Sequence, residues 1–353
     1  MHKVGEKLNK RDWYKRRNIK NLKNRTKKKL AKKAQRTRVY KRNYIQKQLS
    51  IQQNEKKLIE ENGNYKIPFK IPKIFSLIDN SNETIDFFNN ILLYIRNKYN
   101  KGNRLFFDMS DVEYVSNDAL MYLIAIIKNT KIKFNSSGNL PKNKDCRNLV
   151  IESGFLDYLN TLKELELTTT TNKLRIRIGN NINREVAKSI CDFFIDSCGI
   201  PRIKCKFMYD IIIELMTNTI QHAYNNSMLI SYWYVFLERS DNIVKMVFLD
   251  TGDGIPETLR KNWLEKIKLL NVKDDCELIQ SALNGDFRTR TEQKYRGKGL
   301  PKIYKYYKEG KIKNLKIISR HGVISSNNNN LKSKLQGTLF SWEININKFI
   351  EEE

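Results

Sequence analysis

Three polar residues recur along one stripe of a helix that the sequence predicts from Phe207 onward. Glu214, Asn218 and His222 are spaced four residues apart and therefore lie on one side of that helix, beside an apolar side that would face a core. An asparagine amide oxygen can bind Mg²⁺, and a carboxylate one turn away can orient or deprotonate a water or hydroxyl. Taken alone, such a stripe is more often the solvent-facing side of an ordinary amphipathic helix.

A second segment ends an apolar strand in a carboxylate. The predicted strand covers residues 243–249 and is followed at once by Asp250, and then by Gly252 and Gly254. A carboxylate in this place could accept a hydrogen bond from the amino group of a flat ring, and the glycines would let such a ring approach the backbone. A tight turn between a strand and a helix often has the same composition, so this segment alone is ambiguous.

A third segment combines two glycines and a lysine at the start of a helix. Gly297, Lys298 and Gly299 precede apolar residues at helical spacing, which begin with Leu300. Free backbone N–H groups at a helix start, with a lysine alongside, form a cradle for phosphate. A fourth segment, the predicted closing strand, contains Thr338 and carries almost no signal of its own.

In this order the four segments resemble the GHKL family of ATP-binding domains, which includes gyrase, the heat-shock-90 chaperones, histidine kinases and mismatch-repair ATPases. The resemblance covers residues 166–347. The branch most similar in form and order is that of the anti-sigma-factor serine kinases, through ELMTNTIQHAY, LDTGDGIP and FRTRTEQKYRGKGL. It implies an α/β sandwich with a mixed sheet and helices on one face, and ATP with Mg²⁺ as cofactors.

The resemblance also implies a role for each matching residue. Glu214 would be the catalytic general base or water-positioning group, and Asn218 would bind Mg²⁺. Asp250 would read the adenine amino group, directly and through a water held with Thr338. Residues 256–296 would form a mobile lid. The implied ATP-binding residues are Asn218, His222, Asp250, Gly252, Gly254, Ile255, Gly297, Lys298, Gly299, Leu300 and Thr338.

The order of predicted elements would place these residues around one sheet. A strand from Lys173 leads to helices over 184–197 and 203–224, strands over 228–238 and 243–249, the lid, a helix, and strands near Leu315 and Leu335. Strands that alternate with helices in this way are typical of an α/β layer structure. His222 would either support this structure or touch phosphate.

The preceding segment, residues 66–165, predicts a smaller α/β domain. Its run FFDMSDVEYVSNDALMYL resembles the signature of STAS domains, and NLVIESGFLDYL resembles the last helix of that family. The serine that is phosphorylated in the family falls here on Asn117 or Asp118, and neither side chain carries the hydroxyl that the family phosphorylates. The resemblance therefore implies a docking module for a protein partner, without a phospho-switch at this position.

The first 62 residues predict a basic arm that is helical or partly disordered. Of the formal net charge of +28, +18 lies in residues 1–50, with aromatic residues between the cations. This density favours contact with nucleic acid or a ribonucleoprotein, although an acidic protein surface or solubility alone would also explain it. The candidate contact residues are Arg16, Arg17, Lys27, Lys28, Lys29, Arg36, Arg38 and Arg42.

Composition excludes several other classes. The five cysteines form no CxxC pair, which argues against a disulfide framework or a zinc knuckle. No apolar run is long enough for a membrane helix, and no apolar segment follows the first charges as a secretory signal would require. The sequence therefore predicts a cytoplasmic protein without a membrane partner.

Three functions fit this organisation. The first is an ATP- and Mg²⁺-dependent molecular switch with slow ATPase activity, in which nucleotide state changes pairing with a second copy, a partner or nucleic acid. The second is a Ser/Thr protein kinase that acts on a STAS-type partner. The third is a nucleic-acid-binding protein with a nucleotide-sensing domain. The combination of modules suits a bacterial regulatory or defence system by analogy.

Overall fold

The computed structural model describes residues 66–99, 103–160, 169–170, 172–221, 228–287 and 299–350. They belong to one compact unit, Lys66–Glu353. The predicted basic arm lies outside the described residues, with all of its candidate contact residues. In the described part of the chain, no helix combines the length and the apolar character that crossing a membrane would need.

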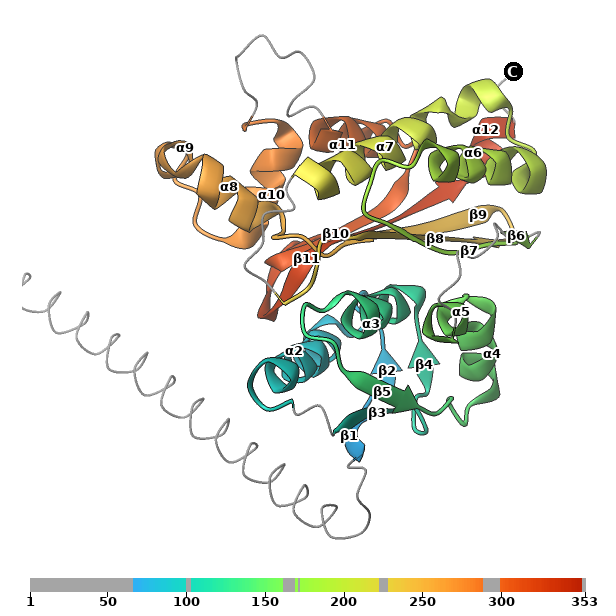
Figure 1. The fold of residues 1–353 in the computed structure, drawn as a ribbon. Coiled ribbons are helices and arrows are strands. Elements are labelled where there is room, and N and C mark those ends of the chain that lie inside the picture. Colours follow the sequence, from blue (N-terminus) through green and yellow to red (C-terminus); the bar gives the residue numbers. More distant parts are fainter. Residues whose placement is uncertain are drawn as a thin grey trace, which may run out of the picture. The chain divides into compact units, whose positions relative to one another are not determined.

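A six-stranded sheet lies at the centre of this unit (Figure 1). In spatial order its strands are β10 (Lys313–Ile324), β11 (Asn329–Asn345), β9 (Ile243–Asp250), β8 (Trp233–Ser240), β7 (Lys173–Gly179) and β6 (Thr169–Thr170). The predicted α/β class is confirmed. The sequence predicted a mixed sheet here, but all five pairings between these strands are antiparallel. The pairs β8–β9 and β10–β11 are consecutive along the chain, and short connections between neighbouring strands produce antiparallel pairs.

Helices of the C-terminal segment, residues 166–347, cover one face of this sheet. They include α6 (Arg184–Cys198), α7 (Lys206–Gln221) and α11 (Gly299–Lys308). Val244, Met246 and Phe248 are alternate residues of β9, and all three belong to the hydrophobic core that these helices share with the sheet. The sequence predicted the second of these helices over residues 203–224, and the structure begins it three residues later.

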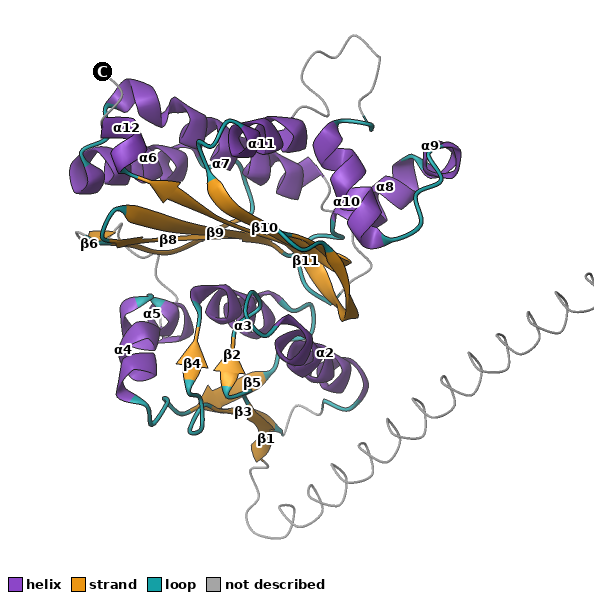
Figure 2. Cartoon of the chain, turned by 180° about the vertical axis from the view of Figure 1, so that it is seen from behind, coloured by secondary structure: helices purple, strands orange, loops and turns teal. Residues whose placement is uncertain are grey.

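Helices of the N-terminal segment, residues 66–165, cover the opposite face (Figure 2). They include α2 (Ser81–Asn97), which contacts β11, and α3 (Asn117–Asn129), which contacts β9. Val247 and Leu249, the other alternate residues of β9, join the core of these helices. The sequence predicted helices on one face only. Because β9 is apolar at both alternations, its second face also needs a cover, and the N-terminal segment supplies it.

The N-terminal segment has a small parallel sheet of its own. Its strands are β1 (Lys66–Lys70), β3 (Arg104–Asp108) and β5 (Asn135–Gly138), and β2 (Ile74–Phe75) pairs with β4 (Tyr114–Val115) in parallel. β1 contains Pro68 and lies at an edge of this sheet, where strands tolerate proline. The run NLVIESGFLDYL, which resembles a single family helix, lies in two helices here, α4 (Lys144–Glu152) and α5 (Phe155–Asn160), because Gly154 between them has a φ of +83°.

The turn that resembles the STAS signature is buried within the unit. Asn117 is 8% exposed and Asp118 is 1% exposed. The Asp118 carboxylate accepts a hydrogen bond of 2.6 Å from the backbone N–H of Leu77, and burial raises its pKa. A partner protein could therefore not reach these two side chains unless the segment opened.

The described part of the predicted lid is a packed helical cluster. It consists of α8 (Ile255–Asn262), α9 (Leu264–Leu269) and α10 (Asp275–Asn284), with a hydrophobic core of its own. Asp275 is buried, pairs with Arg260 and accepts a hydrogen bond of 2.9 Å from the backbone N–H of His321 on β10. A second ion pair joins Glu257 to Arg320 at 3.1 Å. These contacts attach the cluster to the edge of the sheet.

Candidate functional site

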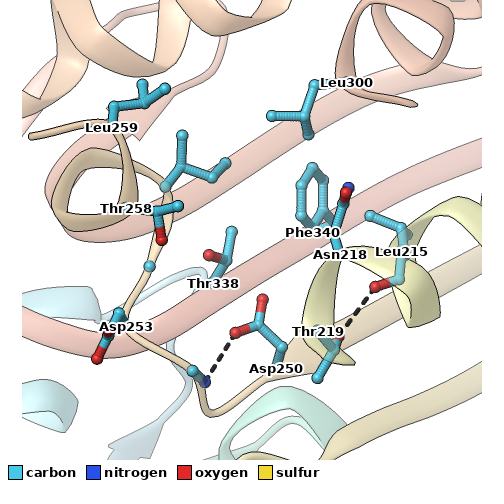
Figure 3. Close-up of a pocket in the computed structure, with 13 residues that line it drawn as sticks. Leu215, Asn218, Thr219, Asp250, Asp253, Thr258, Leu259, Leu300, Thr338 and Phe340 are labelled. Atoms are coloured by element: carbon cyan, nitrogen blue, oxygen red, sulfur yellow. Dashed lines mark hydrogen bonds between the residues drawn. The ribbon is translucent and has the colours of Figure 1, made fainter. Parts of the chain in front are cut away.

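A pocket lies where the end of β9 meets α7, α8 and the start of α11 (Figure 3). Seven residues predicted from the sequence line it together: Asn218, Asp250, Gly252, Gly254, Ile255, Leu300 and Thr338. They come from all four of the segments that the sequence singled out. The fold therefore brings residues that are far apart in the sequence to one cavity.

Asp250 is the carboxylate of this pocket. It is the last residue of β9 and pairs across the sheet with Thr338, and its side chain points into the cavity (Figure 3). Its Oδ1 accepts a hydrogen bond of 2.9 Å from the backbone N–H of Gly252. Burial raises the pKa of Asp250 to about 6, although the hydrogen bonds from Gly252 and Thr338 act in the opposite direction. Such a carboxylate has acceptor capacity left for a ligand donor.

A buried hydroxyl network supports the wall beside Asp250. The hydroxyl of Ser319 accepts a hydrogen bond of 2.9 Å from the N–H of Ile255, donates to the carbonyl of Gly337 at 3.1 Å, and lies 3.0 Å from the hydroxyl oxygen of Thr338. Ser319 is completely buried. This residue was not predicted, because a serine within a strand gives no signal in the sequence.

Glu214 lies beside the start of α11 rather than in the pocket lining. A Cβ atom added to Gly299 would lie 2.7 Å from Oε2 of Glu214, so the carboxylate lies directly against this glycine. Lys302 of α11 donates a hydrogen bond of 2.8 Å to Asp210, one turn before Glu214. Burial raises the pKa of Glu214, Lys302 opposes that shift, and Asp210 adds to it. The carboxylate is thus held at the helix terminus that the sequence predicted to bind phosphate.

Three predicted site residues lie outside the described residues: His222, Gly297 and Lys298. The lining also includes six residues that the sequence analysis did not assign, namely Leu215, Thr219, Asp253, Thr258, Leu259 and Phe340. Leucine and phenylalanine at these places look like ordinary core residues in the sequence. Asp253 could have been predicted, because it lies within the glycine-containing motif between Gly252 and Gly254. Its carboxylate pairs with Lys261 at 2.6 Å.

The described residues contain no group of three or more His, Cys, Asp or Glu side chains that could hold a metal ion. Where Mg²⁺ binds together with a nucleotide, it takes only one or two protein oxygens, along with phosphate oxygens and water. Asn218 lines the pocket and offers one amide oxygen of this kind.

No protein-family model matches this chain. No curated protein sequence matches it either. Among solved structures, it is similar to the histidine kinase domain of the blue-light activated histidine kinase from Erythrobacter litoralis EL346, with 14% sequence identity, 58% of this chain and 78% of that chain covered, and a TM-score of 0.21. A likeness at this TM-score does not identify the ligand of the pocket, so its assignment depends on the residues of this chain.

Proposed function

We propose that the pocket binds ATP together with Mg²⁺, as in GHKL domains. One observation carries this proposal: Asn218, Asp250, Gly254 and Thr338, which come from three separate motifs in the sequence, line the same cavity. Chance clustering of one motif is common, but a shared cavity for several motifs in the expected order is not.

The chemistry of the lining sets the orientation of the nucleotide. The Asp250 carboxylate would accept a hydrogen bond from the adenine amino group, beside the apolar side chains of Ile255 and Phe340. The phosphates would extend toward the N-terminus of α11, where backbone N–H groups favour negative charge. Asn218 would hold the magnesium ion, which neutralises phosphate charge when bound.

We further propose that the protein is a nucleotide-dependent switch with slow ATPase activity. The buried turn at Asn117 and Asp118 supports a switch over phosphorylation within the chain, because neither residue has a serine hydroxyl and neither is accessible. A Ser/Thr kinase acting on a separate STAS-type protein remains the second candidate. The placement of Glu214 beside Gly299 favours it too, since a general base serves either acceptor.

ATP turnover tests the role of Glu214. We expect Glu214→Gln to lower turnover at least about 100-fold, because the amide cannot accept a proton, while the dissociation constant for ATP changes less than about threefold. Steady-state phosphate release and calorimetric titration measure the two quantities. Glu309→Gln, at the surface near the end of α11, is the matched control and should keep wild-type turnover. Wild-type turnover in Glu214→Gln would contradict the assignment, and labelled phosphate on a partner protein would favour the kinase.

We also propose that the basic arm binds nucleic acid or a ribonucleoprotein. The support is the charge of +18 within residues 1–50. Cations that neutralise phosphates release counterions, so affinity should fall steeply with salt. We expect deletion of residues 1–50 to abolish the salt-dependent binding of RNA or DNA in a gel-shift titration. Unchanged binding by the shortened chain would show that the arm is not the contact.

A further inference from the structure

A bulge interrupts β11 directly behind the pocket. Ser319 and Arg320 are neighbours on β10, but their partners on β11 are three positions apart, which leaves Gln336 and Gly337 as the bulged residues. Directly after the bulge, the pairing of β11 with β9 begins at Thr338 and Asp250. The bulge therefore lies at the point of the sheet that carries the carboxylate of the pocket.

On the pocket side, the bulge fixes the backbone that carries Asp250. Gly337 has a φ of +96°, and a Cβ atom added to it would lie 1.9 Å from the carbonyl oxygen of Asp250. The side-chain amide of Gln336 donates a hydrogen bond of 3.2 Å to the carbonyl of Thr251. A displacement of the bulge would therefore move the end of β9.

On the other side, the bulge is held by the N-terminal segment. The hydroxyl of Tyr122, on α3, donates a hydrogen bond of 3.2 Å to the backbone carbonyl of Gln336. Tyr122 is 1% exposed. Burial raises the pKa of Tyr122, and the negative charge of Asp250 adds to this shift. Tyr122 thus joins the cover of the sheet to the wall of the pocket.

We infer that Tyr122 is a positioning residue for Asp250, through which the N-terminal segment sets the affinity of the pocket for adenine nucleotides. This inference rests on the proposed binding of ATP. Without the hydroxyl, the Gln336 carbonyl loses the partly buried hydrogen bond from Tyr122, and the bulge can relax away from the arrangement that aims Asp250 into the cavity. The N-terminal segment is then a regulator of the nucleotide site, and not only a cover for the sheet.

The test compares two conservative variants of the full chain. Tyr122→Phe removes the hydrogen bond to the bulge, whereas Tyr158→Phe removes a bond of the same kind, 2.8 Å long, from α5 to the carbonyl of Ile176 on β7. Dissociation constants are measured for ATP and for inosine triphosphate, which has a carbonyl oxygen in place of the adenine amino group. We expect Tyr122→Phe to weaken ATP binding about fivefold and to change inosine triphosphate binding by less than about twofold. Tyr158→Phe should match the wild-type protein for both nucleotides.

A double-mutant cycle completes the test. In an Asp250→Asn background, Tyr122→Phe should have no further effect on ATP binding, because it acts through the same group. An equal loss for both nucleotides, an additive effect in the double variant, or wild-type ATP affinity in Tyr122→Phe would each overturn the inference while leaving ATP binding itself intact. If the wild-type protein does not bind ATP, the proposed function fails, and this inference fails with it.

Discussion

The Asp250→Asn variant is expected to bind ATP about 100-fold more weakly than the wild-type protein and to be more stable toward unfolding. The loss of affinity follows because the amide replaces a charged acceptor by a neutral group that can present its own N–H to the adenine amino group. Calorimetric titration with ATP measures it. Asp241→Asn is the control, since Asp241 is an exposed residue in the turn between β8 and β9, at the other end of the same strand.

The gain in stability follows from the pKa of Asp250. This pKa is about 6 in the folded protein, above the ordinary value of 3.8, so the folded state holds its proton more tightly than the unfolded state does. The free energy of unfolding therefore falls as pH rises from about 4 to about 6, and the whole cost is present at pH 7. Asparagine carries no such cost. We expect a gain of about 1–3 kcal/mol at pH 7 that disappears toward pH 4, measured by urea unfolding at both pH values.

The same pKa predicts a pH dependence of binding. The ratio of ATP affinities between the wild-type protein and Asp250→Asn should shrink as the pH falls through about 6, because the wild-type carboxylate then becomes neutral. The protonation of ATP changes its affinity for both proteins equally, so it cancels in this ratio. A ratio that stays constant from about pH 5 to about pH 8, a range that includes the pKa of Asp250, would show that Asp250 does not contact the ligand.

Gly337→Ala is expected to lower the free energy of unfolding by about 3 kcal/mol or more. An alanine there must adopt a φ of +96°, and its Cβ would lie 1.9 Å from the Asp250 carbonyl oxygen and 2.8 Å from the carbonyl carbon. Both neighbours are backbone atoms in paired strands, so no side chain can turn away to make room. The strands β9 and β11 would have to separate at the pocket.

Gly199→Ala separates this steric effect from backbone strain. Gly199 ends α6 with a φ of +69°, but an added Cβ there would have no neighbouring atom within 4 Å. We expect it to cost only about 1 kcal/mol. Urea unfolding of both variants provides the comparison. Equal losses would mean that the contact between Gly337 and Asp250 does not constrain the fold.

The parts of the site that the sequence predicted are those whose signal is local. Asp250, Gly252 and Gly254 follow one another after an apolar strand, so their order alone indicates a strand end with an accessible backbone. The signal of Glu214 and Asn218 is also local, because residues four apart lie on one side of a helix. Ser319 and Tyr122 could not be predicted, because their roles depend on strand register and on a contact between segments more than 200 residues apart.

The fold was predictable to the same extent. The helices and long strands follow from apolar periodicity, whereas β5 has the sequence NSSG and forms only because its backbone pairs with β3. The cover of the second sheet face was not predicted, since periodicity shows that β9 is buried on both sides but not by what. The break at Gly154 depends on one residue with a positive φ, which a helical pattern does not show.

The shared core between the N-terminal helices and the sheet bears on how the chain can be divided and synthesised. A fragment that begins after residue 165 would expose Tyr234, Phe236, Val247, Leu249 and Leu339 to water, and so large an apolar area favours aggregation. The segment made first by the ribosome must also wait for strands made much later before its helices can complete their packing. The segments 66–165 and 166–347 therefore depend on each other for folding, and neither is a suitable expression fragment on its own.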